Sequence, residues 1–221
     1  MSYDLFLRDR VTGECLQVPA HMMYGGNMKC RRNEDGFLEP DTTTDAYLNI
    51  TYNYSRYYYE AFPGVEGEYG DPERHAEDAA RFGITDSAGG IRSLNGLTGH
   101  QAVPLLEEMA RRIEAKYKDF EGWVDTERDK VWYESKRNPG LKKDPTDMFL
   151  EYLNMKKDGL SDEQIGKHLE ERWTKREKTV LVSEGDTSDY WEPTAANALR
   201  PLYQLVALSH LRPDGVWSEE S

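Results

Sequence analysis

The residues best suited to bind a ligand alternate along one short stretch near residue 50. Tyr47, Asn49, Thr51 and Asn53 recur at every second position, which places their side chains on one face of a β-strand. Hydroxyl and amide groups donate and accept hydrogen bonds, and a tyrosine ring can stack on a flat ligand. We therefore predict a binding surface here, with Arg92 as the guanidinium for an anionic group. The alternative is an ordinary polar strand face.

Residues that would support catalysis or metal binding lack the necessary spacing. Cys15, His21 and Cys30 lie six and nine residues apart, which matches no zinc ligand pair. No glycine-flanked serine marks a nucleophile elbow, and no Walker lysine follows a glycine-rich turn. Carboxylate pairs are too abundant to be informative. We therefore expect no metal or other cofactor and favour a non-enzymatic protein, with an enzyme acting on nucleotides as a further alternative.

A helix expected to begin at Thr98 offers a second place for an anion. Thr98 and Gln101 have the spacing of a capping box, in which each side chain satisfies the other residue's backbone amide. The unpaired amides and the dipole of such a terminus attract anions. Capping without a ligand is the favoured interpretation.

The segment 146–182 suggests a different class of function. Two helices, expected over 144–157 and from Ser161 onward, are joined by a short turn, as at the front of a helix-turn-helix unit. The apolar residue expected about eleven positions after Ile165 is instead Arg176. The basic residues of this segment are Lys167, Arg172, Lys175, Arg176 and Lys178. Glu170, Glu171 and Glu177 lie among them and reduce its positive charge. A DNA-binding regulator is therefore the alternative function, ranked below a solvated helical hairpin.

The elements that must position the binding row centre on residues 46–62. This stretch contains six of the fourteen tyrosines. The spacing of its apolar and aromatic residues changes from two to three or four near residue 53, as when a strand runs into a helix. We predict an α+β fold in which a small antiparallel sheet is packed by helices. The sheet comprises 3–18 and 46–52, and the helices are expected at 54–62, 98–117 and 194–210. Further helices are expected at 72–82 and 120–136, and a loop at 21–44.

Charge divides the chain into two parts. Residues 111–180 contain 17 Lys and Arg and 16 Asp and Glu, whereas the remainder contains 11 basic and 25 acidic residues within a net charge of −13. We predict one acidic core from 1–110 and 181–221, with 111–180 as an inserted helical arm. An acidic core disfavours unspecific nucleic-acid binding, which depends on Lys and Arg displacing counterions. The aromatic content is compatible with a homodimer.

The N-terminus is charged and lacks the apolar run of a signal peptide, and no stretch approaches the ~18 apolar residues of a membrane span. We expect a cytoplasmic protein without membrane contact. Cys15 and Cys30 lie in polar surroundings, which suits reduced thiols, with a disulfide between them as the alternative.

Several strings resemble an uncharacterised family of small proteins encoded by bacteriophages and prophages. They are MSYDLFLRD, LNITYNYSRYYYEAF, GIRSLNGLTG, DYWEPTAANA and LRPDGVW. The resemblance covers about half the chain, and 63–90 and 111–180 depart from it. It implies expression in the bacterial host cytoplasm but no activity or catalytic residue. We expect an accessory protein that binds a host factor or a small nucleotide-like ligand, in a role that counteracts host defence.

Overall fold

The computed structural model describes residues 2–19, 30–40, 42–118 and 123–220, without the side chains of residues 30, 31, 38 and 40. It divides the chain into two units, of which unit 1 contains residues 1–124 and 183–221 and unit 2 contains residues 125–182. The first boundary differs from the predicted 110 because helix α3 (Gly99–Tyr117) continues through that position. The fold class is α+β, as predicted.

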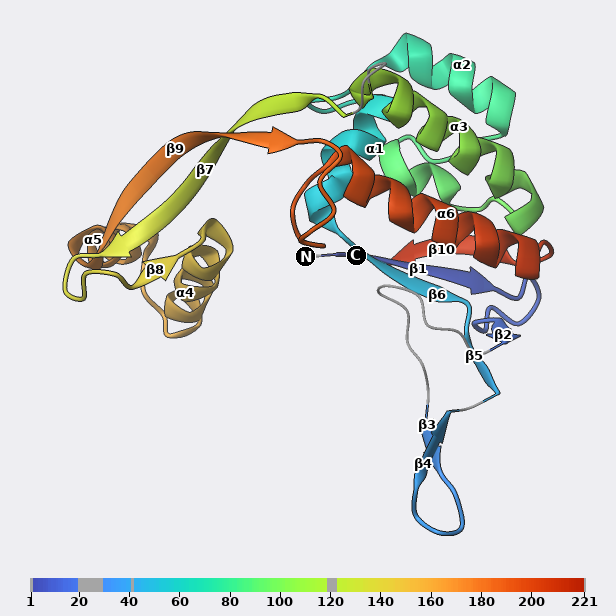
Figure 1. Cartoon of the computed structure of the whole chain (residues 1–221), viewed down its shortest axis with the longest axis horizontal. Helices are drawn as coiled ribbons and strands as arrows, with labels where there is room; N and C mark the ends of the chain where they lie inside the picture. Colours follow the sequence, from blue (N-terminus) through green and yellow to red (C-terminus); the bar gives the residue numbers. More distant parts are fainter. Residues whose placement is uncertain (1, 20–29, 41, 119–122, 221) are drawn as a thin grey trace. The chain divides into compact units, whose positions relative to one another are not determined.

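The main sheet of unit 1 has three antiparallel strands. Strand β1 (Ser2–Arg8) lies between β10 (Val216–Glu220) and β6 (Tyr47–Thr51) (Figure 1). Leu5 of β1 is opposite Leu48 of β6. The sequence prediction placed the segments of β1 and β6 in one sheet but left out β10, which joins the sheet from the far end of the chain.

Alternation along the strands separates an apolar face from a polar face. Tyr3, Leu5 and Leu7 of β1 are buried, as are Leu48 and Ile50 of β6. Because successive side chains point to opposite faces, the intervening residues of both strands lie on the other face. The sheet therefore has one side for the core and one for polar side chains.

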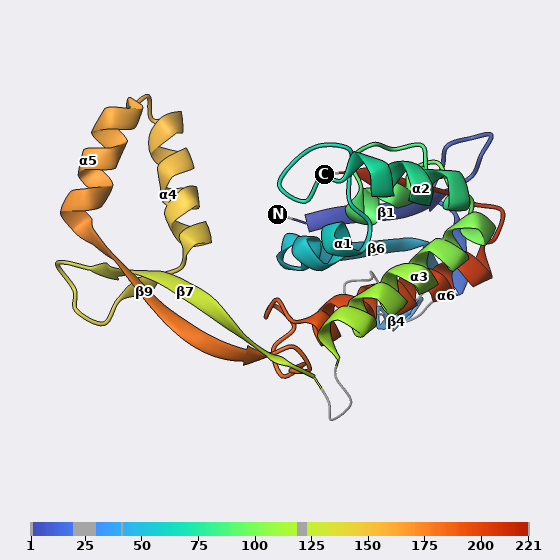
Figure 2. The same ribbon diagram turned by 90° about the horizontal axis from the view of Figure 1, so that it is seen from above.

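Three helices form the core with the apolar face. Helices α1 (Ser55–Ala61), α3 and α6 (Ala195–Leu211) contribute to a single hydrophobic cluster with the sheet. Helices α3 and α6 pack side by side (Figure 2). The capping box of Thr98 and Gln101 is present at the start of α3. The helices predicted at 98–117 and 194–210 are confirmed to within a few residues.

The tyrosine-rich stretch lies at the centre of this core. The 3₁₀ helix η1 (Tyr52–Tyr54) joins β6 to α1. The side chains of Tyr54, Tyr57 and Tyr58 are at most 1% exposed. Burial of three large aromatic side chains in one turn and a half of helix makes this stretch a main source of hydrophobic stabilisation.

Smaller elements surround the core of unit 1. Helix α2 (Pro72–Phe82) has the predicted range and is capped by Asp71, and η2 spans Gly90–Leu94. The hairpin expected over 3–18 closes through a bridge between Arg8 and Cys15. The following strand pairs elsewhere, so this part of the prediction was wrong.

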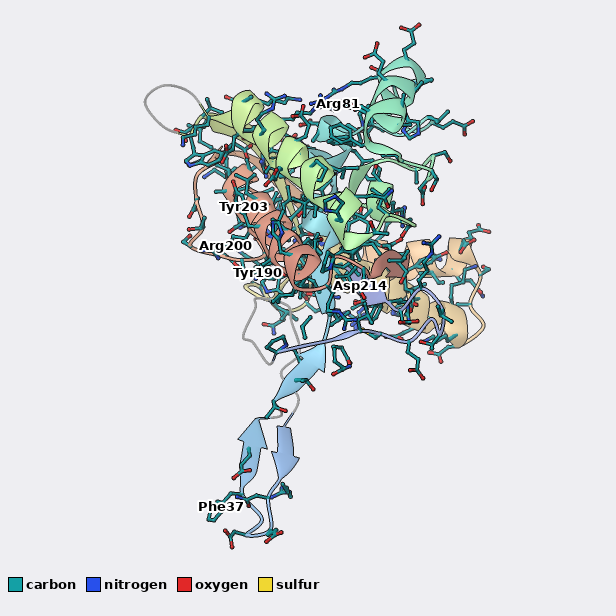
Figure 3. The ribbon with its side chains drawn as sticks, turned by 90° about the vertical axis from the view of Figure 1, so that its right-hand side faces the viewer. Phe37, Arg81, Tyr190, Arg200, Tyr203 and Asp214 are labelled. Carbon is teal, nitrogen blue, oxygen red and sulfur yellow. The ribbon has the colours of Figure 1, made fainter. Side chains whose placement is uncertain are left out.

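Short strands replace part of the loop predicted at 21–44. Strand β2 (Gln17–Pro19) pairs with β5 (Thr43–Asp45), and β3 (Cys30–Arg32) pairs with β4 (Leu38–Pro40). Phe37 lies at the tip of the second hairpin and is 71% exposed (Figure 3). Residues 21–29 and 41 of the predicted loop lie outside the described residues, as does the side chain of Cys30.

Unit 2 contains a β-ribbon and a pair of helices. Strand β7 (Asp125–Ser135) lies between β8 (Lys142–Lys143) and β9 (Trp173–Ser183). Helices α4 (Pro145–Lys157) and α5 (Asp162–Arg172) have the predicted caps Asp144 and Ser161.

The helix predicted over 120–136 is therefore wrong where strand β7 lies. The few apolar residues used for that prediction were too widely spaced to define a helical face, and the β-branched and aromatic run Val131-Trp132-Tyr133 favours a strand. The inserted arm is consequently mixed α and β rather than helical.

Candidate functional site

The first two residues of the predicted binding row lie together on the polar face of the sheet. The Tyr47 hydroxyl donates to Asp4 Oδ1 at 2.5 Å. The Asn49 amide donates to the same oxygen at 2.8 Å and to Ser2 Oγ at 2.7 Å. Burial, reinforced by the bond to Asp4, raises the pKa of Tyr47 to about 12. This part of the row is held by internal hydrogen bonds around a carboxylate, which does not favour an anionic ligand.

The other three predicted residues separate from this pair. Thr51 is 4% exposed, and its hydroxyl accepts the backbone amide of Asn53 at the start of η1. The Asn53 side chain is exposed and donates to the carbonyl of Trp191 at 2.8 Å. Arg92 donates to Glu219 Oε2 at 3.1 Å. The structure thus does not gather the five predicted residues into one site.

A pocket of about 400 Å³ in unit 1 has the charge that the predicted row lacks. We call it the α1–α3 pocket because those helices supply most of its lining. Four of the lining side chains are cationic and one is a carboxylate. The lining residues are Tyr57, Glu60, Ala61, Arg74, Arg111, Arg112, Ile113, Ala115, Lys116 and Tyr117.

Local sequence explains how α3 presents its cations. Residues Met109, Ile113 and Tyr117 are buried and recur at a spacing of four, so they form the inward stripe of the helix. Arg112 and Lys116 follow the same spacing one position earlier, which places them beside that stripe. The cations therefore lie at the rim of the core, next to α1.

Arg112 is held by the protein itself. Its guanidinium bonds both carboxylate oxygens of Asp78 at 2.6 and 2.7 Å, Glu108 Oε1 at 2.9 Å and the Ala61 carbonyl at 2.9 Å. Asp78 and Arg112 are largely buried, and such paired, hydrogen-bonded charges are positioned rigidly. Arg112 therefore shapes the pocket, and its charge is already compensated.

Arg74 of helix α2 is bound differently. It donates to the carbonyls of Ala61 at 2.8 Å and Glu60 at 3.3 Å. These carbonyls lie at the end of α1, where unpaired helix carbonyls carry partial negative charge. Within the described part of the chain, no carboxylate pairs with Arg74. Its positive charge is thus only partly compensated.

The remaining charges of the pocket are exposed or shared. Arg111 is 65% exposed in its side chain and pairs with Glu108 at 2.6 Å. Lys116 is 56% exposed and pairs with Glu60 at 3.1 Å. Arg56 also contacts Glu60, at 3.2 Å. Each of these carboxylates is shared, since Glu60 pairs with two cations and Glu108 pairs with three.

The hydroxyl of Tyr117, which lines the pocket, completes the charge network. Tyr117 donates to Glu60 and accepts from Arg56 at 3.0 Å. Burial, followed by the bond to Glu60, raises the pKa of Tyr117 to about 12, so this phenol stays neutral at physiological pH. Its ring and that of Tyr57 are almost fully buried. They support the pocket but offer no open face for stacking.

The balance of charge in this region is positive. Six cations, those of Arg56, Arg74, Arg81, Arg111, Arg112 and Lys116, face three carboxylates, those of Glu60, Asp78 and Glu108. The excess of three positive charges occurs in a protein with a net charge of −13. A doubly charged anion such as a phosphate monoester would neutralise most of it.

The predicted alternative at the start of α3 lacks the groups that it needs. A larger pocket of about 800 Å³ adjoins Thr98. However, the amides of Gly99, His100 and Gln101 donate to Gly215 O, Pro213 O and Thr98 Oγ1 respectively. Because anion binding at a helix start requires unpaired amides, this terminus is capped internally.

The segment predicted to read DNA does not form a continuous basic helix. Helix α5 ends at Arg172, and Lys175, Arg176 and Lys178 lie on strand β9. Lys175 and Arg176 pair with glutamates, Glu177 and Glu134. A recognition helix carries its basic side chains along one helical face, which this arrangement does not supply.

Sequence reasoning missed the α1–α3 pocket because its cations come from separate segments. Arg111, Arg112 and Lys116 were assigned to the inserted arm on the basis of charge density, although α3 carries them in unit 1. The available signal was the spacing of Arg112 and Lys116 beside the apolar stripe. Nothing in the sequence near Arg74 indicates that it meets the end of α1.

Among the described residues, no group of three or more His, Cys, Asp or Glu side chains is arranged to hold a metal ion. His21 lies outside those residues. In the same part of the chain, no helix combines the length and apolarity needed to cross a membrane. No protein-family model, curated protein or solved structure matches this chain.

Proposed function

We propose that this protein is a phage-encoded, non-enzymatic accessory protein that binds a small nucleotide-like ligand through its phosphate in the α1–α3 pocket. The observation that carries the proposal is the local excess of three positive charges around a pocket of about 400 Å³. Pockets of this size suit small molecules. Sequestering such a ligand inside the host would counteract a defence that depends on it.

The chemistry of the pocket supports a main role for the phosphate. Arg74, Arg111 and Lys116 have the least compensated charges and supply guanidinium and ammonium donors. Arginine matches the geometry of phosphate oxygens, and such charge-assisted bonds are stronger than neutral ones. The tyrosine rings that line the pocket are buried, so stacking of a base contributes little. We therefore expect weak discrimination among bases.

Equilibrium dialysis against a ligand panel tests this proposal. The panel contains nucleosides, the corresponding 5′-monophosphates, cyclic dinucleotides and inorganic phosphate. We expect the phosphorylated compounds to bind and the nucleosides not to bind. Binding should weaken with added salt, because exposed charges are screened over about 10 Å at 0.1 M. Equal binding of nucleosides and nucleotides would contradict the proposal.

A further inference from the structure

Helix α4 of unit 2 carries two exposed leucines on one side. Leu150 and Leu153 are 53% and 37% exposed. They lie three residues apart, on a side of the helix away from Met148, which is 7% exposed and lines a pocket of the same unit together with Phe149. Exposed apolar groups that gather on one helix face commonly mark an interaction surface.

The charges that flank this face are self-complementary. Asp147 lies one turn before the apolar face and Lys157 one turn after it, and both are exposed. When two copies of α4 pack antiparallel about a two-fold axis, Leu150 of one copy meets Leu153 of the other. Asp147 of each copy then lies near Lys157 of its partner, so each contact occurs twice, as a two-fold interface requires. The dipoles of the two antiparallel helices also point in opposite directions, so the N-terminus of each helix lies beside the C-terminus of its partner.

The charge of the whole unit permits this contact. Unit 2 contains 13 basic and 13 acidic residues, whereas unit 1 contains 15 and 28. Two copies of unit 1 repel each other, but two copies of unit 2 meet without net repulsion. A second copy of this chain is therefore the partner that the apolar face and its flanking charges fit.

We infer that the protein forms a two-fold homodimer through antiparallel packing of α4. A 13-residue helix is about 20 Å long, so the contact is smaller than a standard interface and the dimer should be weak. This inference does not depend on the ligand proposed for unit 1.

Sedimentation velocity of the full chain tests the inference, over concentrations from about 1 µM to about 1 mM, the range in which small interfaces associate. We expect a monomer–dimer equilibrium. Leu150→Glu with Leu153→Glu should raise the dimer dissociation constant at least about tenfold, since apolar contact is replaced by buried like charges. Leu181→Glu is the matched control, because Leu181 is 71% exposed on β9 of the same unit. It should leave the equilibrium unchanged.

Charge exchange tests the antiparallel arrangement. Asp147→Lys and Lys157→Asp should each weaken the dimer, and the two together should restore it, because opposite charges face each other again. Far-UV circular dichroism verifies that α4 remains folded in each variant. A wild-type protein that stays monomeric throughout the series would overturn the inference and leave the α4 face to a different protein. A dimer unaffected by the Leu150 and Leu153 changes would also overturn it.

Discussion

At the scale of single residues, the cations of the α1–α3 pocket divide into structural and available groups. Arg112 uses its donors on Asp78, Glu108 and the end of α1. Arg111 and Lys116 are mostly exposed and share carboxylates with other cations. The phosphate of the proposed ligand would thus meet Arg111 and Lys116 while the bonds of Arg112 stay in place.

Glu108 makes the stability of this network depend on pH. Hydrogen bonds from Arg111 and Arg112 lower the pKa of Glu108 from 4.5 to about 2. A carboxyl with a lowered pKa in the folded state stabilises the protein above its unfolded pKa, and this contribution is lost as pH falls towards the folded value. The free energy of unfolding of the wild type should therefore fall by about 2–3 kcal/mol between about pH 5 and about pH 2 because of this group.

Urea denaturation at a series of pH values measures this effect. Glu108→Gln should be less stable than wild type at neutral pH, and the difference should shrink as pH falls. Glu107→Gln is the matched control, since Glu107 is exposed on the same helix. A Glu108→Gln protein whose deficit is the same at both ends of the series would contradict this account of the network.

The predicted site shows what residue patterns can and cannot specify. Alternation correctly placed Tyr47 and Asn49 on one strand face. It did not reveal that Asp4, from a different strand, accepts hydrogen bonds from both. Thr51 and Asn53 leave the row because the strand ends and η1 begins. Which partners a polar side chain meets depends on contacts between distant segments, which no local period encodes.

At the scale of elements, the buried carboxylate of Glu184 joins two helices. It is 0% exposed. The Tyr57 hydroxyl of α1 donates to its Oε2 at 2.6 Å, and the Ala195 amide at the start of α6 donates to the same oxygen at 2.8 Å. A carboxylate is stabilised at a helix N-terminus by unpaired amides and the dipole. Glu184 therefore fixes the start of α6 against α1.

Replacing Glu184 should destabilise unit 1. Glu184→Ala leaves the buried Tyr57 hydroxyl and the Ala195 amide without this acceptor, and the loss of hydrogen bonds to a buried charge costs about 2–4 kcal/mol. The free energy of unfolding from urea denaturation measures the effect. Glu192→Ala is the control, because the Glu192 carboxylate makes no hydrogen bond within the described residues, and it should change stability by less than about 0.5 kcal/mol. Equal effects of the two substitutions would contradict the assigned role.

Elements with local start signals could be predicted from the sequence. Helices α3, α4 and α5 each begin at a predicted cap, because the cap and the helix it starts are adjacent in the chain. Strand β10 has only one fully buried apolar side chain, Trp217, and pairs with β1 some 200 residues away. Strands of this kind are defined by their partner, so the sequence pattern alone did not show β10.

At the scale of the whole molecule, unit 2 is an insertion whose two ends meet. The Glu184 amide donates to the Val124 carbonyl at 2.9 Å, and both residues belong to unit 1. Joining these ends by a short linker closes a loop across a small gap, and the entropy cost of closing a short loop is low. Unit 1 also contains the main hydrophobic core.

Deleting residues 125–182 and joining the ends with a short Gly/Ser linker should therefore leave unit 1 folded. We expect a cooperative unfolding transition and retained ligand binding, measured by circular dichroism and equilibrium dialysis. The same linker placed inside α6 is a control that should abolish folding. If the shortened chain is unfolded, unit 1 requires unit 2, and the division into independent units is wrong.

The most direct test of the proposed function is the calorimetric dissociation constant of a nucleoside 5′-monophosphate for wild type and for Arg111→Ala combined with Lys116→Ala. Hydrogen bonds to charged groups contribute about 1.5–3 kcal/mol each, so we predict that the double variant binds at least about tenfold more weakly. Arg10→Ala, an exposed arginine at the turn after β1, should bind as wild type does. Equal affinities of wild type and the double variant, with the fold intact, would contradict an anion site between α1 and α3.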